Sequence, residues 1–362
     1  MKIYHLSLLS LLLAASLLSC QGKVDQTVHA SESISLQQPQ SQVLTEAQIW
    51  MSDPLLKQYS KVLLSHPLPI DSQGAMGENQ ISGKPFRVGW QREGFKAIAY
   101  GLSAQDHSAI EKGIQAYAFA FRNQTSDGLF GKSSHPEIVS FLGSYGRSLL
   151  LLRDSNQRDY ISQLEQYLPN LKRAVHNAQM RQKESELRTM IPSIHESNQL
   201  IWAGLDYSLL YQVTSDSRFK ELATLCLKTA VERQTQAGVF PEKGGGDTHY
   251  QAVSLEKLIL FSLYSRQSHL TQNYLSRGFN WLSQKIMADY TMNTQANTRT
   301  GKKQELGPSK QFKEGRYGNP EAYIFWSYLG GNPNSRQRAK GFINRIFQEK
   351  FGCTVSQCYV SR

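Results

Sequence analysis

A helical rhythm is the feature that most constrains how this 362-residue chain can fold. In five segments, apolar residues recur at spacings of three and four, and a short polar break follows each segment. This spacing places the apolar side chains on one face of an α-helix. The segments are FKAIAYGL, IVSFLGSYGRSLLLL, LIWAGLDYSLLYQV, YQAVSLEKLILFSLY and AYIFWSYLGG.

Each polar break leads into a second, more polar helix, and the Asp and Ser residues in the breaks suit helix N-caps. The predicted unit is an apolar helix, a tight turn, an amphipathic helix and a longer loop. We expect about five such pairs, an unpaired helix near residues 46–65, and almost no strands. The breaks are SAQD, RDSNQ, TSDS, SRQSH and GNPNS.

The chain also repeats a short motif. RNQTSDGLFG at 122–131 resembles RQTQAGVFPEKGG at 233–245, with an offset of 110 residues. This offset fits two units of about 55 residues each, a length typical of helical repeats. The aligned positions are Gln124 with Gln234, Thr125 with Thr235, Gly128 with Gly238, and Phe130 with Phe240.

An apolar helix paired with an amphipathic one suggests an inner and an outer ring of helices. Such repeats build an open solenoid or a closed toroid, and the long, loosely similar units favour the toroid. We therefore predict an all-α fold over 46–350, an (α/α) toroid of about five to six helical hairpins. A helical-repeat scaffold that binds protein is the structural alternative.

The architecture and the loop GVFPEKGGGDTHYQ resemble the (α/α) toroid superfamily, which includes six-hairpin glycosidases and polysaccharide lyases. The resemblance covers most of residues 46–350. It implies a carbohydrate-active enzyme.

The first residues are typical of a secretory signal. Lys2 precedes an apolar run at 6–18 that is too short to span a bilayer. The stretch from Leu17 to Cys20 resembles the lipobox of bacterial lipoproteins, which implies cleavage of signal peptide 1–19 and lipidation of Cys20. An ordinary signal peptide with an incidental Cys is the alternative. Residues 20–45 are predicted to be a flexible tether. The resulting expectation is a lipid-anchored protein of the bacterial cell envelope, with Gln21 favouring the outer membrane.

Cysteine usage suits an oxidising compartment. Cys353 and Cys358 lie five residues apart in the tail 351–362, and a disulfide between them would pin that tail. A zinc site is less favoured, because no second Cys or His pair accompanies them. Cys226 lies in an apolar helical pattern and is expected to be buried.

The formal net charge of +11 favours an anionic partner, because a basic cleft concentrates anionic ligands. A solvated basic surface is the simpler interpretation. For an exported lipoprotein we expect an acidic polysaccharide or oligosaccharide, with the membrane contacted through the anchor. The sequence has no strip of alternating basic and aromatic residues of the kind that binds single-stranded nucleic acid, so nucleic-acid binding is not predicted. No cofactor or metal is predicted, since HExxH and CxxC are absent from the sequence.

If inner and outer helices alternate, all inner helices start at the same end, and their leading loops should meet there. Those loops carry most of the chemistry, whereas the opposite turns are plain Ser, Asp and Asn breaks. The five leading loops are 89–92, 134–137, 195–198, 247–250 and 316–321. The predicted catalytic residues are His249, Tyr250, Asp247, Asn198, His195, Arg316 and Tyr317. The predicted substrate-binding residues are Trp90, Arg92, His135, Glu137, Glu242 and Glu321.

Helix capping is the competing explanation for the acids in these loops. Asp247 stands where an N-cap residue should stand. Glu137 and Glu321 each follow a proline in a first helical turn, where the helix dipole favours an acid. Capping does not explain the adjacent pair His249 and Tyr250.

The first candidate chemistry is β-elimination on a uronic-acid polysaccharide. The enzyme must neutralise the uronate carboxylate and supply a base for the neighbouring proton. The toroid lyases that this chain resembles use Asn or Arg for the first task and His or Tyr for the second. The resemblance implies Asn198 and Arg316 for charge stabilisation. It implies His249, His195, Tyr250 or Tyr317 for proton transfer.

The second candidate is glycoside hydrolysis by paired carboxylates, with Asp247 as the leading acid. Its possible partners are Glu137, Glu242, Glu196 and Glu321. Trp90, Tyr250 and Tyr317 could stack on sugar rings under either chemistry. The third candidate is a surface lipoprotein that binds glycan or protein without turnover.

Overall fold

A computed structural model describes residues 44–265, 268–299 and 318–360, all within the unit 42–362. These residues are helical, with isolated bridges in place of extended strands, so the predicted all-α class is confirmed for them. No helix in these three stretches is both long and apolar enough to cross a membrane. The predicted signal peptide and Cys20, and the tether up to residue 43, lie outside the described residues.

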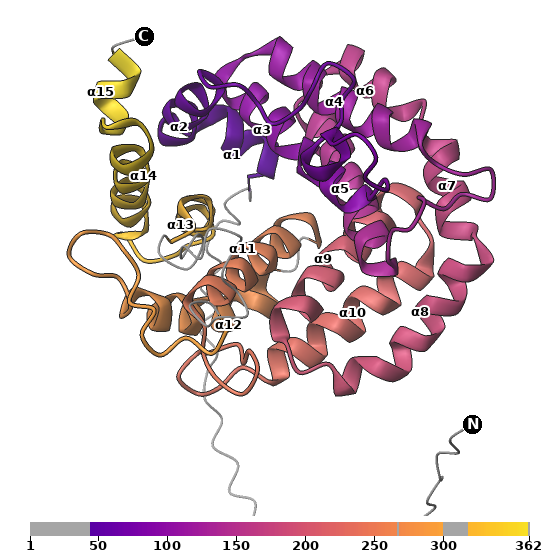
Figure 1. Cartoon of the computed structure of the whole chain (residues 1–362). Coiled ribbons are helices and arrows are strands. Elements are labelled where there is room, and N and C mark those ends of the chain that lie inside the picture. The colour runs from indigo at the N-terminus through magenta and orange to yellow at the C-terminus, as the bar shows by residue number, and fades with distance from the viewer. Residues whose placement is uncertain (1–43, 266–267, 300–317, 361–362) are drawn as a thin grey trace, which may run out of the picture. The chain divides into compact units, whose positions relative to one another are not determined.

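Five pairs of helices follow the predicted pattern (Figure 1). We call the members of each pair the first and second helices. The first helix α9 is buried on nearly all sides, whereas the second helix α10 buries one stripe that includes Phe219, Leu222 and Cys226. The pairs are α3 (Gly94–Ala104) with α4 (His107–Arg122), α5 (His135–Asp154) with α6 (Arg158–Glu165), α9 (Ser197–Thr214) with α10 (Ser217–Glu232), α11 (Thr248–Ser265) with α12 (Ser268–Ser283), and α13 (Pro320–Tyr328) with α14 (Ser335–Phe351).

The first helices contact one another in chain order: α3 with α5, α5 with α9, α9 with α11, and α11 with α13. The hydroxyl of Tyr100 on α3 donates a hydrogen bond to Glu321 on α13 at 3.0 Å. The earliest of the five first helices therefore contacts the last one.

Prolines and helix caps divide two stretches into separate helices where the apolar spacing predicted one continuous helix. The single helix predicted near 46–65 is wrong, because the chain forms α1 (Glu46–Ser52) and α2 (Pro54–Leu64). Pro54 suits a first helical position, and the Asp53 carboxylate accepts the N–H groups of Leu55 and Leu56.

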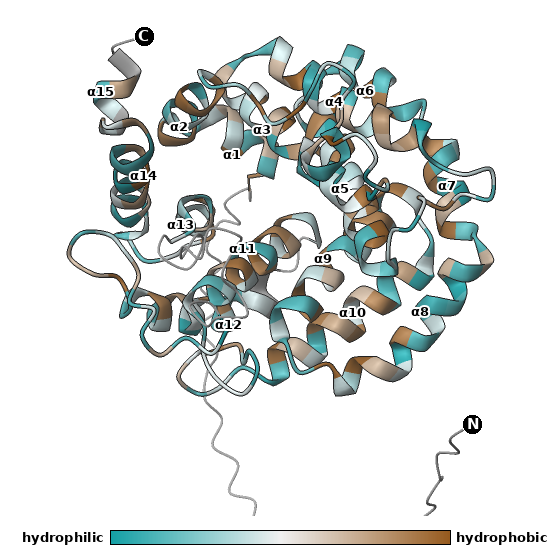
Figure 2. Cartoon of the chain, viewed as in Figure 1, coloured by the Kyte–Doolittle hydropathy of each residue, from teal (hydrophilic) through white to brown (hydrophobic). Residues whose placement is uncertain are grey.

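The second stretch follows α6. The chain adds α7 (Leu168–His176) and α8 (Ala178–Met190), where the pattern predicted one amphipathic helix. Pro169 lies in the first turn of α7, and the Asn177 side chain caps α8. Figure 2 shows that hydrophilic residues line much of α8 and of α14. Short 3-10 turns complete the described chain: η1 (Gly77–Gln80), η2 (Val88–Glu93) and η3 (Ile191–Ser193).

Helix α1 joins the first helices to one another through a buried ion pair. The carboxylate of Glu46 accepts two hydrogen bonds from Arg147 on α5, at 2.6 and 3.0 Å. It also accepts one from Tyr264 on α11 at 2.7 Å and one from Trp50 at 2.9 Å. Glu46 is 1% exposed and Arg147 is 3% exposed. The Trp50 ring packs edge-on against Tyr100 of α3 and Phe325 of α13.

The repeated motif is a tight turn that precedes a buried apolar residue. Thr125 and Thr235 each accept a bond from the glycine three residues on, and each donates to the carbonyl four residues on, all at 2.9 Å. Gly128 and Gly238 have φ of 94° and 91°, a conformation that favours glycine. A Cβ on Gly238 would lie 2.2 Å from the backbone oxygen of Arg277 on α12. The turn therefore rests directly on the next second helix.

Two further copies of this turn exist that sequence comparison did not detect. Asp71 donates to the carbonyl of Ala75 at 3.1 Å, and Met287 donates to that of Thr291 at 2.8 Å. The fourth copy carries Tyr290, with φ of 59°, where the others carry glycine. The four copies recur at spacings of about 55 residues or twice that, as expected for one supersecondary unit. The residues that follow the turns, Met76, Phe130, Phe240 and Met292, are all buried.

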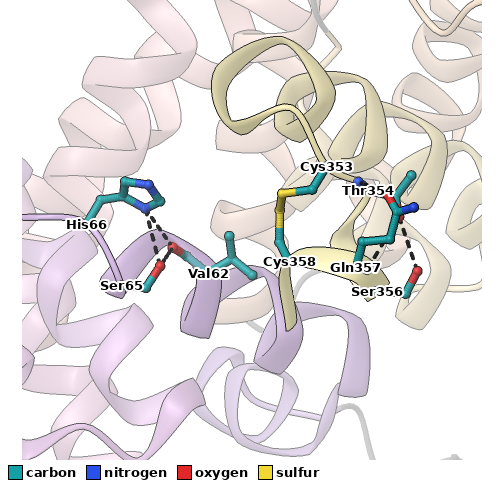
Figure 3. Close-up of a disulfide and its surroundings, with 8 residues drawn as sticks. All are labelled: Val62, Ser65, His66, Cys353, Thr354, Ser356, Gln357 and Cys358. Atoms are coloured by element: carbon teal, nitrogen blue, oxygen red, sulfur yellow. Dashed lines mark hydrogen bonds between the residues drawn. A yellow bond between two sulfur atoms is a disulfide. The ribbon is translucent and has the colours of Figure 1, made fainter. Parts of the chain in front are cut away.

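The C-terminal tail lies beside the start of the unit. The structure joins Cys353 and Cys358 in a disulfide, just before and within α15 (Val355–Val360) (Figure 3). Helix α15 contacts α2, and the His66 ring stacks on Phe351 with centroids 4.0 Å apart. The tail therefore connects the last hairpin, α13 with α14, to helix α2 near the start of the unit.

We predict that Arg147→Met lowers the free energy of unfolding by roughly 3–5 kcal/mol, because it leaves the Glu46 carboxylate buried without its counter-charge. Urea unfolding measures the change. Arg153→Met is the matched control, since its ion pair with Glu165 is more than one-third exposed and contributes about 1 kcal/mol or less. Equal losses in the two variants would contradict a structural role for the buried pair.

Candidate functional site

Polar chemistry concentrates in one cavity of about 580 Å³, called the central cavity below. Its walls come from η2 and the first helices, with Tyr59 added by α2. Three of the five leading loops contribute to it, through Arg92, through His249 and Tyr250, and through the segment 318–321. Its basic side chains are Arg92, Lys96, Arg147 and Lys257, and its acidic side chains are Glu93, Asp206, Glu256 and Glu321.

Two of these cations share one aromatic ring. The Arg92 guanidinium lies 4.9 Å from the centroid of the Trp202 ring, and the Lys257 ammonium lies 5.0 Å from it. A ring face attracts a cation at these distances. Trp202 therefore lies beside two positive charges of the cavity wall, which also pair with Glu93 and Glu256 at 3.3 and 3.0 Å.

The carboxyl groups of the central cavity divide into two kinds. Burial opposes ionisation of Glu93, but Lys96 at 2.8 Å lowers its pKa to about 2. Burial also opposes ionisation of Glu256, yet the charge and hydrogen bond of the adjacent Lys257 lower its pKa. Both groups are ionised at neutral pH.

The other two carboxyl groups favour the protonated form. Burial raises the pKa of Asp206 well above its ordinary value, even though Lys257 and Arg92 act in the opposite direction. Burial, followed by the negative charge of Glu256, raises the pKa of Glu321. Burial therefore disfavours negative charge on both of these acids.

His249 and Tyr250 line the central cavity from the first turn of α11. Their rings meet edge to face with centroids 5.2 Å apart. The Arg299 guanidinium lies 3.7 Å from the centroid of the Tyr250 ring and also bonds Glu242 at 2.8 Å and Asn198 at 3.3 Å. Tyr250 is thus backed by a fixed positive charge.

Asp247, the leading acid of the hydrolase hypothesis, has the capping role. It is fully buried and does not belong to the lining of the central cavity. Its Oδ1 accepts the N–H groups of His249 and Tyr250 at 3.0 and 3.2 Å, and its Oδ2 accepts the Arg299 N–H at 3.0 Å. Asp247 therefore positions the backbone of the two cavity residues that follow it.

Glu242 and Asn198 belong to the network behind Tyr250. The Glu242 carboxylate is fully buried and accepts the Asn198 N–H at 2.7 Å. Burial raises the pKa of Glu242 to about 7, although Asn198 and Arg299 stabilise its charge.

The remaining predicted residues lie elsewhere. His195 lines a separate depression with Lys243 and Gly244. Trp90 is 42% exposed. Glu137 bonds Arg87 and caps α5 through the N–H of Ser134 at 2.8 Å. Arg316 and Tyr317 lie outside the described residues. His135, Glu137 and Asn198 line a second cavity of about 380 Å³, discussed below.

Sequence reasoning missed the residues that carry most of the cavity's charge and its shared aromatic ring. Lys96, Arg147, Trp202, Asp206, Glu256 and Lys257 lie within helices, whereas the predicted site residues came from the loops before the helices or from their first turns. One signal was present in the sequence: Trp202 and Asp206 are four residues apart within an otherwise apolar helix.

Among the described residues, no group of three or more His, Cys, Asp or Glu side chains is placed to hold a metal ion. No family model, no curated protein and no solved structure matches the chain. The geometry of the cavity is therefore the main ground on which a function can be argued.

We predict that the free energy of unfolding falls as pH drops from about 6.5 towards 4, in part because of His135. Burial, and then the charge of Lys183, lower the pKa of His135 from 6.5 to about 4. Within this interval the unfolded chain binds a proton that the folded protein does not, so acid favours unfolding.

Urea unfolding at several pH values should show a shallower dependence in His135→Gln than in the wild type. His176→Gln, which removes an exposed histidine at the end of α7, is the matched control and should keep the wild-type slope. An unchanged slope in His135→Gln would contradict the assignment.

Proposed function

We propose that this protein is a carbohydrate-active enzyme that cleaves a uronate-containing polysaccharide by β-elimination. The observation that carries the proposal is the central cavity itself. There, His249 and Tyr250 share one cavity lining with the two cations beside Trp202. A base beside fixed positive charge is the pairing that this chemistry requires.

We also propose the (α/α) toroid as the arrangement of the helices. Its support is the alternation of first and second helices, the Tyr100–Glu321 contact between α3 and α13, and the four copies of the repeated turn. Each hairpin buries its apolar face against its neighbours, as in other helical repeats.

In the proposed reaction, Arg92 and Lys257 bind the uronate carboxylate and stabilise the negative charge that develops next to it. Tyr250 or His249 removes the proton on the carbon adjacent to the carboxylate. The bond between the next ring carbon and the glycosidic oxygen breaks, and a carbon–carbon double bond forms. The departing oxygen takes a proton from the conjugate acid of the base. The guanidinium over Tyr250 stabilises charge on that ring during the transfer.

A second candidate, glycoside hydrolysis, is favoured by the contrast between Asp206 and Glu256. Asp206 favours the protonated form, whereas Glu256 is ionised in the same cavity. Two carboxyl groups with opposed pKa shifts are suited to the acid and base roles of a hydrolase. On this chemistry Asp206 takes the place that sequence reasoning gave to Asp247.

The proposed location is the bacterial cell envelope, with the chain tethered through lipidated Cys20. The lipobox-like segment 17–20 and the polar stretch that follows it support this placement. An excess of basic residues suits an acidic polysaccharide as the partner.

The test is incubation with a panel of acidic and neutral polysaccharides, following both the ultraviolet absorbance of unsaturated uronate and the release of reducing ends. β-Elimination produces both signals from a uronate polymer. Reducing ends without unsaturated product would identify the hydrolase instead. Binding of a polymer with neither signal would identify a non-catalytic glycan-binding protein.

We predict that Tyr250→Phe or His249→Ala lowers kcat/KM of the lyase by roughly 10²–10⁴, because the proton-transfer group is lost. Tyr167→Phe and His176→Ala are matched controls, since both residues lie on α7 or just before it and away from the cavity. If both cavity variants retain wild-type activity while Asp206→Asn loses it, the lyase mechanism is wrong and the hydrolase mechanism stands.

A further inference from the structure

The second cavity differs from the central one in its chemistry. Its volume is about 380 Å³, and it lies among α5, α8, α9 and α10. Apolar side chains make up most of its wall, including Val139, Leu187, Leu200 and Ala203. A cavity of this kind suits a small, largely apolar group rather than an ion.

Three buried polar atoms of this wall have no hydrogen-bond partner among the described residues: the Tyr207 hydroxyl, His135 Nε2 and Ser140 Oγ. Tyr207 is fully buried. Leaving such groups unsatisfied is costly, and native proteins rarely do so. A buried polar group of this kind is therefore suited to bonding a polar atom supplied by a ligand.

The side chains of Tyr207 and His135 are neutral at physiological pH. Burial lowers the pKa of His135 to about 4 and raises that of Tyr207 well above its ordinary value. A neutral tyrosine donates a hydrogen bond, and a neutral histidine donates one from the nitrogen that carries its proton. A neutral tyrosine donor in a mostly apolar wall matches a carbonyl oxygen flanked by hydrocarbon.

The second cavity adjoins the central one. Arg92, Ser140, Trp202 and Asp206 line both. A substituent on a sugar ring held in the central cavity can therefore extend past Trp202 into the second cavity.

We propose that the second cavity binds an acyl substituent, an acetyl ester or amide, carried by the sugar in the central cavity. Tyr207 donates to the acyl carbonyl, and the apolar wall surrounds its methyl group. The acyl part can be tested without turnover, whereas its attachment to the substrate rests on the proposed function.

The first experiment is a calorimetric titration of the full chain with acetanilide and, separately, with propylbenzene, a hydrocarbon of similar size without the carbonyl. We expect acetanilide to bind roughly three- to tenfold more tightly, the effect of one hydrogen bond. Tyr207→Phe should abolish this preference. Tyr145→Phe, which removes a buried hydroxyl that bonds Leu164 and lies outside both cavities, should keep it.

The second experiment compares kcat/KM on an acetylated uronate polymer and on the same polymer after deacetylation. The ratio should exceed one in the wild type and fall towards one in Tyr207→Phe and in Ala203→Leu, which fills the cavity. A wild-type ratio of one or less would overturn the link to the substrate.

The two experiments separate the failures. Acetanilide preference without turnover of any polymer supports the acyl cavity and overturns only the proposed enzyme. Equal binding of acetanilide and propylbenzene, or binding of neither, overturns the acyl cavity whatever the enzyme does.

Discussion

The buried pair of Glu46 and Arg147 is the contact on which the rest of the structure depends. Two charges removed from water are stable only when each finds full compensation, and the Glu46 carboxylate accepts hydrogen bonds from Arg147, Tyr264 and Trp50. These bonds connect α1 to α5 and α11 at one point. Arg147 also lines the central cavity, with its guanidinium 3.9 Å from the centroid of the Phe95 ring. The same residue therefore anchors the fold and contributes to the site.

The charge of the central cavity follows from burial acting differently on neighbouring groups. Asp206 and Glu256 lie in one cavity and both have Lys257 nearby, yet their pKa values shift in opposite directions. The direct hydrogen bond from Lys257 to Glu256, at 3.0 Å, accounts for part of the difference. Burial without such a bond raises the pKa of an acid, as it does for Asp206.

Sequence periodicity predicted the helix pairs well, because burial of a helix face requires apolar residues at fixed spacings. It also located the segments that lead into the first helices. Two limits are physical. A proline and a cap can divide a helix without interrupting its apolar rhythm, as Asp53 and Pro54 do between α1 and α2. The repeated turn is held by backbone hydrogen bonds, so its side chains can differ from copy to copy. The copies at Asp71 and Met287 therefore could not be detected by comparing sequences.

The site was harder to predict than the fold. Asp247 was predicted to be catalytic, with helix capping as the alternative, and the structure shows its oxygens accepting backbone N–H groups. Trp202 and Lys257 lie on different helices, and their contact depends on the packing of α9 against α11. A single sequence carries no record of such a pairing.

The Tyr100–Glu321 bond joins residues 221 positions apart, and the bond between Glu46 and Tyr264 joins residues 218 positions apart. Contacts of such long sequence separation carry a large loop-closure cost and are associated with slow folding. The α1 helix is synthesised first but has no complete partner surface until α11 and α13 have emerged from the ribosome. The lining of the central cavity spans Tyr59 to Glu321, so a chain that stops before α13 lacks part of the cavity wall.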